Sequence, residues 1–370
     1  MDTLSVDVLI IALNKIEFDA RLTNFINTLI SNNYSIATVT LDSSFTSNSF
    51  YSFEIKLNEN LKTFEKTFLF NLKAQNYFNK IHPRYVLCSD VYSLPAGRYF
   101  KKKYKSCVIY DSREIYSALS SLRSKRLKQL VLTKFENYLV RFVDKIIVTG
   151  ELDKEILQKL FPSKSMYVIK NFPSSVIFRP YNKPNLRQKL KLPENSVLLV
   201  YQGVLLEGRG IEIGLEALKY DERLHFIILG TGGFERKFKY LAKELGIENR
   251  THFLGNIPYR QLYDYTSQCD VGLCLIAPLS LSYKLALPNK LFEYCHSGIP
   301  VIATMLPAIE EVFKLFSIGE LVPAYIKPNE LAEKVLYLAE RKSDFTPSLN
   351  KASQIFCWEQ QEEKILEIFR

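Results

Sequence analysis

The segment LPNKLFEYCHSGIPVIAT, residues 287–304, carries an amine and a carboxylate three residues apart in one predicted helix. At this spacing Lys290 and Glu293 share one helix face, and Pro288 suits the first turn because it has no amide to leave unpaired. A lysine so near a helix N-terminus opposes the helix dipole unless an anion binds there. The two side chains are therefore either a surface ion pair or two parts of one binding site, with the amine on a phosphate and the carboxylate on hydroxyl groups.

Two glycine-bearing segments follow apolar runs that are typical of buried strands. Gly203 ends VLLVYQG, and Arg209 lies between Gly208 and Gly210, immediately before a predicted helix. Gly230 ends the apolar run RLHFIILG in the same way. Small residues allow the backbone to approach a ligand, and helix N-termini favour anions. These loops are either anion-binding loops or plain tight turns.

The sequence gives no pattern typical of a metal site. It has no Asp-x-Asp, and its four histidines are isolated from one another. Its six cysteines form no CxxC pair, which favours reduced thiols in a cytoplasmic protein. The N-terminal apolar run is preceded by Asp2 and Asp7 rather than by the basic residues of a signal peptide, and no apolar run reaches transmembrane length. We therefore expect a cytoplasmic protein without a resident metal.

The formal net charge of +10 is concentrated in residues 98–145, which hold thirteen basic and four acidic residues. Such a stretch is either the solvated face of helices or a surface for polyanions. Stacking aromatics are not interleaved as in known nucleic-acid modules, so we expect no nucleic-acid partner. An anionic membrane surface remains the partner that this stretch suggests, with the protein peripheral on the inner face of the membrane.

Strand-like and helical segments alternate along the chain, which predicts an α/β fold with parallel strands. The pattern breaks in the proline-rich residues 172–196 and resumes at Val197. We therefore predict two doubly wound, Rossmann-like domains, residues 1–172 and 173–355. Ligands of such folds bind beyond the carboxyl ends of the strands, here in the cleft between the domains.

Several of these segments together resemble a known family. Residues 288–303 match the pattern P-N-K-x-x-E-Y-x-x-x-G-x-P-V-I-A of GT-B glycosyltransferases of family GT4, the glycosyl transferases of group 1. In the same half, YQG…RG, LGTGG and THFLGNIP resemble family loops in the family's order. VIYDSRE, FENYLVRFVDKIIVTGE and VIKNFPS in the first half, and the late FCWEQQ, resemble it more loosely.

The resemblance implies a retaining transferase that moves a sugar from a nucleoside-diphosphate sugar, of UDP or GDP type, to a hydroxyl of a glycan or lipid-linked acceptor. It implies surface polysaccharide or glycoconjugate assembly, no metal or cofactor, and a terminal helix in residues 356–370 that packs back on the acceptor-side first domain. The leaving phosphate itself would take the acceptor proton. The implied catalytic residues are Arg113, Arg209 and Lys290. The implied donor-binding residues are Gly203, Arg209, Gly230, Leu254, Asn256, Leu287, Asn289, Lys290 and Glu293.

Three positions depart from the family pattern. Leu285 stands where many members have a glutamate that touches the transferred sugar, and Arg113 replaces the histidine of D-x-H-E. Val204 stands where a basic residue often follows the loop glycine. These departures keep a second hypothesis open, a GT-B-fold partner subunit that binds nucleotide sugars without transferring them. An epimerase of similar architecture ranks lower, because no histidine lies in a recognisable cleft motif.

Overall fold

The computed structural model describes residues 3–42, 49–58, 61–116, 126–176 and 185–370. The chain forms two compact units, Met1–Asn171 with Gln361–Arg370, and Phe172–Gln360. The sequence places the division between residues 172 and 173, one residue later. It also assigns residues 356–360 to the terminal segment, whereas the structure keeps them in the second unit. In the described parts of the chain, no helix has both the length and the apolar composition needed to span a bilayer.

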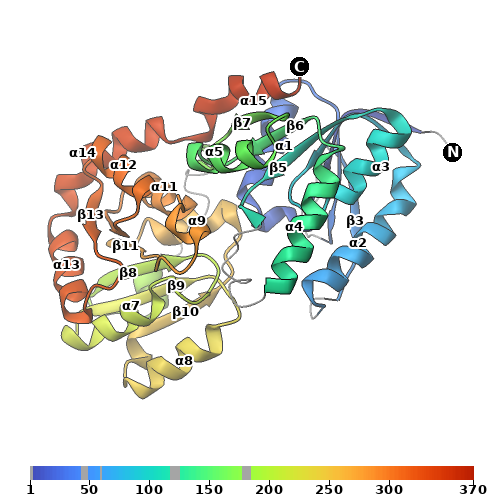
Figure 1. Cartoon of the computed structure of the whole chain (residues 1–370). Helices are drawn as coiled ribbons and strands as arrows, with labels where there is room; N and C mark the ends of the chain where they lie inside the picture. Colours follow the sequence, from blue (N-terminus) through green and yellow to red (C-terminus); the bar gives the residue numbers. More distant parts are fainter. Residues whose placement is uncertain (1–2, 43–48, 59–60, 117–125, 177–184) are drawn as a thin grey trace. The chain divides into compact units, whose positions relative to one another are not determined.

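Within the described residues, the first unit contains a sheet of seven parallel strands in the order β3-β2-β1-β4-β5-β6-β7 (Figure 1). The strands are β1 (Leu4–Ile11), β2 (Ile36–Leu41), β3 (Tyr51–Ile55), β4 (Ile81–Cys88), β5 (Cys107–Ser112), β6 (Lys145–Val148) and β7 (Ser165–Val168). The helices are α1 (Ala20–Ser31), α2 (Thr63–Phe78), α3 (Leu94–Tyr104), α4 (Arg126–Val140), α5 (Glu151–Leu160) and α15 (Glu362–Ile368).

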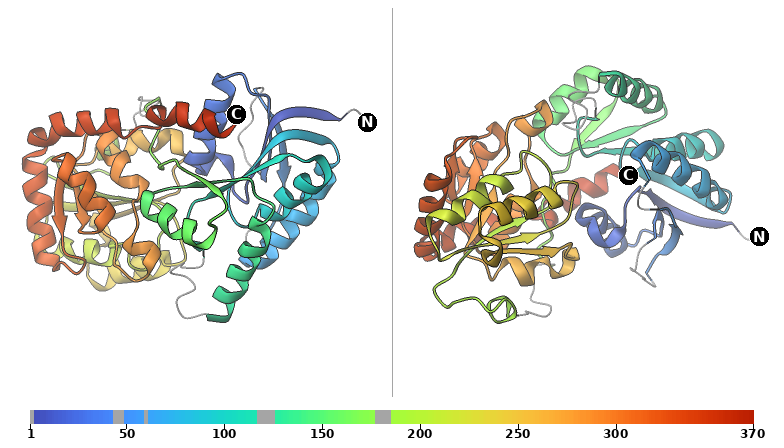
Figure 2. Two further views of the ribbon diagram at one scale, coloured as in Figure 1. Left: turned by 45° about the horizontal axis from the view of Figure 1, so that its top comes forward. Right: turned by 90° about the horizontal axis from the view of Figure 1, so that it is seen from below.

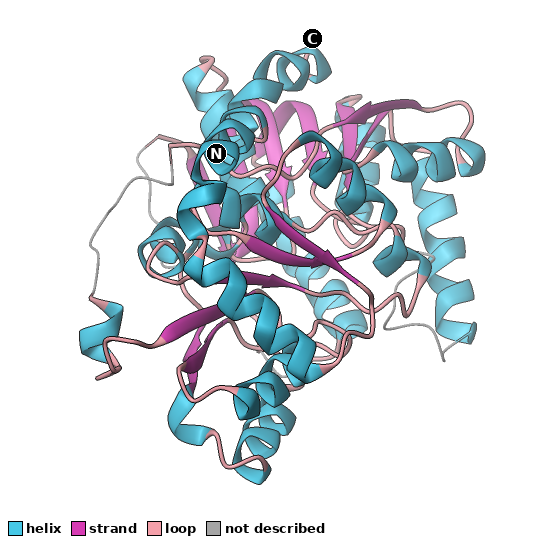
Figure 3. Cartoon of the chain, turned by 90° about the vertical axis from the view of Figure 1, so that its left-hand side faces the viewer, coloured by secondary structure: helices cyan, strands magenta, loops and turns pink. Residues whose placement is uncertain are grey.

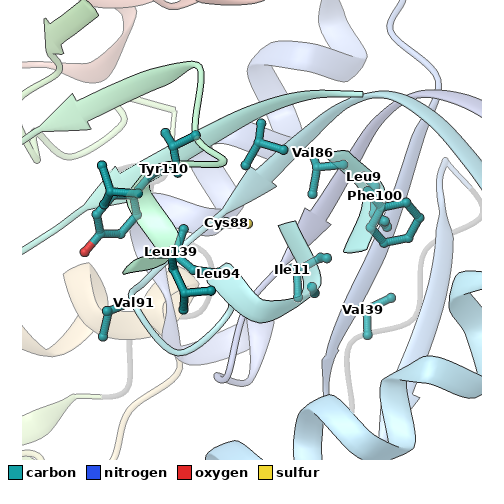
Figure 4. Close-up of a cluster of buried hydrophobic side chains, with 14 of the residues drawn as sticks. Leu9, Ile11, Val39, Val86, Cys88, Val91, Leu94, Phe100, Tyr110 and Leu139 are labelled. Atoms are coloured by element: carbon teal, nitrogen blue, oxygen red, sulfur yellow. The ribbon is translucent and has the colours of Figure 1, made fainter. Parts of the chain in front are cut away.

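The core of this unit forms where α2, α3, α4 and α5 cover one face of the sheet. Figure 4 shows Leu9, Val86 and Tyr110 of the three central strands in the same cluster as Phe100 of α3 and Leu139 of α4. Strands of a parallel sheet covered on both faces are apolar almost throughout, which is why the runs in the sequence predict them well.

The C-terminal residues belong to this first unit. The Asn32 amide donates to a Glu362 carboxylate oxygen at 3.3 Å, and the Lys145 ammonium donates to the Ile368 carbonyl at 2.7 Å. Figure 2 shows the last helix, in red, beside α1, in blue. The helix that the resemblance assigns to the first domain is therefore α15, shorter than the predicted residues 356–370.

Within its described residues, the second unit has a sheet of six parallel strands in the order β10-β9-β8-β11-β12-β13 (Figure 3). The strands are β8 (Val197–Gln202), β9 (Leu224–Leu229), β10 (Thr251–Gly255), β11 (Val271–Cys274), β12 (Val301–Thr304) and β13 (Gly319–Val322). The helices are α6 (Leu186–Lys189), α7 (Ile211–Ala217), α8 (Glu235–Glu244), α9 (Tyr259–Thr266), α10 (Leu281–Lys284), α11 (Asn289–His296), α12 (Pro307–Leu315), α13 (Pro328–Glu340) and α14 (Lys342–Ile355). Helices α11 and α14 share one hydrophobic core with the sheet, and α7, α8 and α13 share the other.

Most elements that the sequence did not predict are edge strands or short or irregular helices. The predicted alternation includes the edge strand β10 but omits the edge strands β3, β7 and β13 and the helices α5, α6, α10, α12 and α14. β3 is a five-residue edge strand with exposed and half-buried positions, so it lacks the apolar run of a central strand. α14 contains Pro347 in its interior, a residue that normally argues against a helix.

Candidate functional site

Helix α11 buries both side chains of the Lys290–Glu293 pair. It begins at Asn289, and Pro288 is the N-cap residue rather than a first-turn residue. Each of the two charged residues is 7% exposed. They form no ion pair with each other within 4 Å, and both belong to described residues. The surface ion pair, one of the two interpretations from the sequence, is therefore wrong.

The Lys290 ammonium is buried without a hydrogen-bond acceptor. It lies 3.7 Å from the centre of the Tyr201 ring, a cation–π contact that partly compensates its lost hydration. Burial, with the nearby Arg209 charge acting in the same direction, lowers the pKa of Lys290 to about 7. The amine is thus held in a place where it gains from an incoming anion.

Arg209 is a second cation in the same place. Its guanidinium lies 4.2 Å from the centre of the Tyr283 ring, and it has no carboxylate partner among the described residues. The loop before α7 depends on Gly210, whose φ is 78° and where an added Cβ would lie 2.4 Å from Leu275 Cβ. Arg209 is near enough to Lys290 for its charge to lower the pKa of that amine, and neither cation has a carboxylate partner within 4 Å among the described residues.

The Glu293 carboxylate is held by the last residue of β8. Gln202, the last residue of β8, donates its side-chain amide to Glu293 Oε2, and the Gln202 Oε1 accepts from the Thr266 hydroxyl at 2.8 Å. Burial raises the pKa of Glu293 to about 7 against the effect of this hydrogen bond. Sequence reasoning missed Gln202 and Thr266. The one available signal was a polar residue that ends an apolar strand directly before Gly203.

The predicted glycines bring the ends of β8 and β9 together. The φ angles of Gly203 and Gly230 are 126° and 141°, which few other residues adopt. A Cβ on Gly230 would lie 2.0 Å from the Gly203 carbonyl oxygen, so the backbones pass without room for a side chain. Leu254 lies on β10, and Asn256 follows that strand, with its Oδ1 accepting from Thr231 at 3.1 Å.

The residues before α11 leave backbone amides at the start of that helix. Leu287 is half-buried against the core, and Asn289 is the first helical residue. Pro288 has no side-chain oxygen to cap the first turn, although its carbonyl accepts from the Leu291 amide at 3.1 Å. The amides of Asn289 and Lys290, at the first two helical positions, have no partner within the helix and suit an anion. Of the departures from the family pattern, Leu285 is the half-buried C-cap of α10 and Val204 is exposed.

Arg113 belongs to the first unit, whereas Arg209 and Lys290 belong to the second. Its Nη1 donates to Asp19 at 2.5 Å and its Nε donates to Asp111 at 3.1 Å, while its Nη2 is buried without a partner. Although burial opposes it, the charges of Asp19 and Asp111 raise the pKa of Arg113, which stays a cation. The structure therefore does not join Arg113 to Arg209 and Lys290 within one unit.

Arg113 lines a pocket of about 360 Å³ at the carboxyl ends of β1, β4 and β5. The wall includes Ser89 and Asp90 after β4, and Thr63 and Lys66 of α2. The Ser89 hydroxyl is buried without a partner, and burial raises the pKa of Asp90. The pocket thus combines unsatisfied donors with carboxylates, a lining suited to a polar ligand rich in hydroxyl groups.

All six cysteines lie in described residues and are free thiols. Among the described residues, no group of three or more His, Cys, Asp and Glu side chains is arranged to hold a metal ion.

The match to a known protein family falls in the second unit. Residues 182–354 match the model of the family described as glycosyl transferases group 1. The O-antigen biosynthesis glycosyltransferase WclY of Escherichia coli is 23% identical over 172 residues, 46% of each chain. The chain spans less than half the length of the curated relatives that it matches.

Two solved structures share the fold over nearly their whole length. Sucrose-phosphate synthase from Thermosynechococcus elongatus superposes with a TM-score of 0.78 at 16% identity, covering 100% of this chain and 98% of that one. HepE of Anabaena, solved in complex with UDP-glucose, gives a TM-score of 0.72 at 17% identity, with 98% of both chains covered. These likenesses confirm the predicted GT-B fold of two parallel-sheet domains.

Proposed function

Because residues 182–354 match the model of the glycosyl transferases group 1 family, we propose that the chain is a retaining glycosyltransferase. It transfers a sugar from a UDP- or GDP-type donor to a hydroxyl of a glycan or lipid-linked acceptor, in surface polysaccharide or glycoconjugate assembly. The observation that carries the proposal is the buried Lys290 ammonium, which has no acceptor and lies next to a second cation, Arg209. A diphosphate supplies the missing anion.

We assign each group of residues in the second-unit site to one part of the nucleotide-sugar donor. Lys290, Arg209 and the backbone amides of Leu287 and Asn289 bind the diphosphate, for which the glycines at 203 and 230 leave backbone room. The Glu293 carboxylate, oriented by Gln202, accepts from the two ribose hydroxyls. Leu254 and Asn256 flank the base.

The proposed reaction needs no protein base. The acceptor oxygen bonds to the anomeric carbon on the face that the diphosphate leaves, the bond from that carbon to the diphosphate oxygen breaks, and the acceptor proton passes to a leaving-phosphate oxygen. Negative charge grows on the diphosphate as its bond breaks. Lys290 and Arg209 are fixed in a low-dielectric setting, so they stabilise this charge more than water would, and we propose that they act without a metal.

We propose that the first-unit pocket takes the acceptor. The unpartnered Arg113 Nη2 and Ser89 hydroxyl would donate to its oxygens, and Asp90 would accept from a hydroxyl.

We also propose a cytoplasmic location, which the six free thiols support.

The alternative, a nucleotide-sugar-binding subunit without transferase activity, is favoured by one observation. Arg113 replaces the family histidine and is bound by two carboxylates, so it cannot act as a neutral hydrogen-bonding ring. Transfer or hydrolysis of a donor by the purified chain decides against this alternative.

The donor assignment predicts that UDP or GDP raises the melting temperature of the chain. Glu293→Ala should weaken nucleotide binding roughly 10- to 100-fold, because it removes charge-assisted hydrogen bonds. Binding is measured by calorimetry, with Glu311→Ala, an exposed carboxylate on α12, as the matched control. If no UDP, GDP or ADP species shifts the melting temperature, the donor site is refuted.

Diphosphate binding should also take up a proton at pH 8. The free Lys290 amine, with a pKa of about 7, is mostly neutral there, and an anion beside it raises that pKa. Glu293, also with a pKa of about 7, is already ionised at pH 8 and adds little. Affinity should therefore fall as pH rises from 7 to 9.

Calorimetry in two buffers of different ionisation enthalpy measures the protons taken up. Uptake should approach one proton per nucleotide and disappear in Lys290→Met. Equal proton uptake in the wild type and the variant would contradict the assignment of Lys290 to the phosphate.

A further inference from the structure

Helix α2 exposes a row of large apolar side chains. Phe64, Phe68 and Leu72 recur every four residues, so they form one stripe along the helix. All three are exposed, and Phe64 is 81% exposed. The opposite side of α2 is anchored in the core by Phe70 and Phe78. The stripe is therefore not needed to hold α2 on the sheet.

Helix α4 exposes a second apolar group, framed by positive charge. Leu127, 75% exposed, lies with Leu130 and Val131 on the outward side of the helix. The single acid of α4, Glu136, is buried and accepts from Tyr110 at 2.8 Å. The exposed bases on α4 and directly after it are Arg126, Lys128, Lys134 and Arg141. Arg123 and Lys125 of the basic stretch lie outside the described residues.

These two groups belong to one layer of the first unit. Helix α3 contacts both α2 and α4, and the three helices lie side by side (Figures 1 and 2). Each follows a strand of a parallel sheet, so the three run in the same direction and start at the same end of the layer. Leu127, Leu130 and Val131 lie in the N-terminal half of α4, and Phe64 and Phe68 lie in that of α2, with Leu72 just beyond its middle. The exposed Lys102, Lys103 and Lys105 are at the C-terminal end of α3, which is the other end of the layer.

We propose that this surface, the α2–α4 face, docks on an anionic lipid bilayer. The exposed apolar side chains would enter the boundary between headgroups and acyl chains, while the exposed lysines and arginines of the same layer contact anionic headgroups. The positive charge favours anionic lipid over other occupants, because α3 and α4 expose no acid and the one exposed acid of α2, Glu65, accepts from the Lys62 amide at 2.9 Å. Within the basic stretch, Lys101 pairs with Asp144 and Arg113 is held in its pocket, so the surface charge comes from the bases named above.

Helix α2 connects this face to the first-unit pocket. Thr63 and Lys66 line the pocket, whereas Phe64 and Phe68 in the same turns point outward. If the pocket takes the acceptor, which rests on the proposed function, a lipid-linked acceptor would meet the pocket at the membrane surface. Binding of the α2–α4 face to a bilayer does not require glycosyl transfer, so an experiment can refute membrane docking without refuting the proposed function, and the reverse.

Vesicle sedimentation of the full chain tests the proposal. The chain should bind vesicles of phosphatidylcholine mixed with phosphatidylglycerol, and bind far less to phosphatidylcholine alone or at high salt. Lys128→Glu with Lys134→Glu should reduce binding at least tenfold, as should Phe68→Ser with Leu130→Ser. The matched controls are Lys243→Glu on α8, and Leu315→Ser with Tyr325→Ser, exposed apolar positions of the second unit. These should leave binding unchanged.

Three results would overturn docking through this face. One is the absence of binding to anionic vesicles. Another is a result in which the lysine-to-glutamate variant loses vesicle binding and the Phe68/Leu130 variant keeps it, because positive charge alone would then account for the binding. The third is a concentration-dependent dimer that the Phe68/Leu130 variant abolishes, because the face would then bind a second copy of the chain.

Discussion

Lys290→Met is expected to weaken nucleotide-diphosphate binding 100-fold or more and, at the same time, to stabilise the unliganded protein. Burial of an ammonium without an acceptor costs free energy, which is why the pKa of Lys290 falls to about 7. Methionine fills a similar volume beside the Tyr201 ring without this cost. Replacement of buried charge by apolar side chains stabilises some proteins by about 1–4 kcal/mol, and a gain of about 1–3 kcal/mol is expected here.

The gain in stability should depend on pH in a defined direction. Between pH 7 and about 10.4, the usual pKa of lysine, the unfolded wild type binds more protons at this position than the folded protein. The stability of the wild type therefore rises with pH in this window, while the variant lacks this contribution. The advantage of Lys290→Met should be largest below pH 7 and shrink toward pH 10.

Urea denaturation of the wild type, of Lys290→Met and of Lys243→Met, an exposed control on α8, measures this gain. Calorimetry with UDP or GDP measures the loss of affinity, expected at 100-fold or more because the buried cation and Arg209 act on one anion. A variant that loses stability as well as binding would mean that Lys290 is a structural residue. Such a result would remove the main support for the donor site.

The pair on α11 could be predicted from the sequence because both residues lie in one helical turn, where spacing alone determines the shared face. The sequence could not predict what surrounds them. Gln202 reaches Glu293 across 91 positions of the sequence, and Tyr201 meets Lys290 only because β8 packs next to α11. Contacts of this kind depend on sheet order, which a pattern of apolar runs does not give.

Arg113 illustrates the same limit in the first unit. The sequence identifies it as a cation in place of a histidine, but not the two carboxylates that hold it. Asp19 is the N-cap of α1, where it also accepts from the Leu22 amide, and Asp111 is on β5. The central strands and their helices follow from apolar runs, whereas the edge strands β3, β7 and β13 are short and only partly buried, so their signal is weak.

Asp111→Ala is expected to destabilise the first unit by about 3–5 kcal/mol, because it leaves a buried arginine without its partner. Asp111 is fully buried on β5 and receives three hydrogen bonds from Arg21, the shortest 2.7 Å, in addition to the one from Arg113. Arg21 is 2% exposed and also donates to the Ile169 carbonyl at 2.8 Å, so it cannot turn toward water.

Circular dichroism during urea denaturation measures the loss. Glu311→Ala, which breaks an exposed pair with Lys314, should change stability by about 1 kcal/mol or less. Arg21→Met combined with Asp111→Leu should recover part of the loss, because it removes the buried arginine charge together with the carboxylate that pairs with it. The recovery should be partial, because Arg113 then has only Asp19 as a carboxylate partner. If Asp111→Ala is no less stable than Glu311→Ala, the Arg21–Asp111–Arg113 cluster does not hold the strand ends together. The fixed orientation of Arg113 in its pocket would then lose its physical basis.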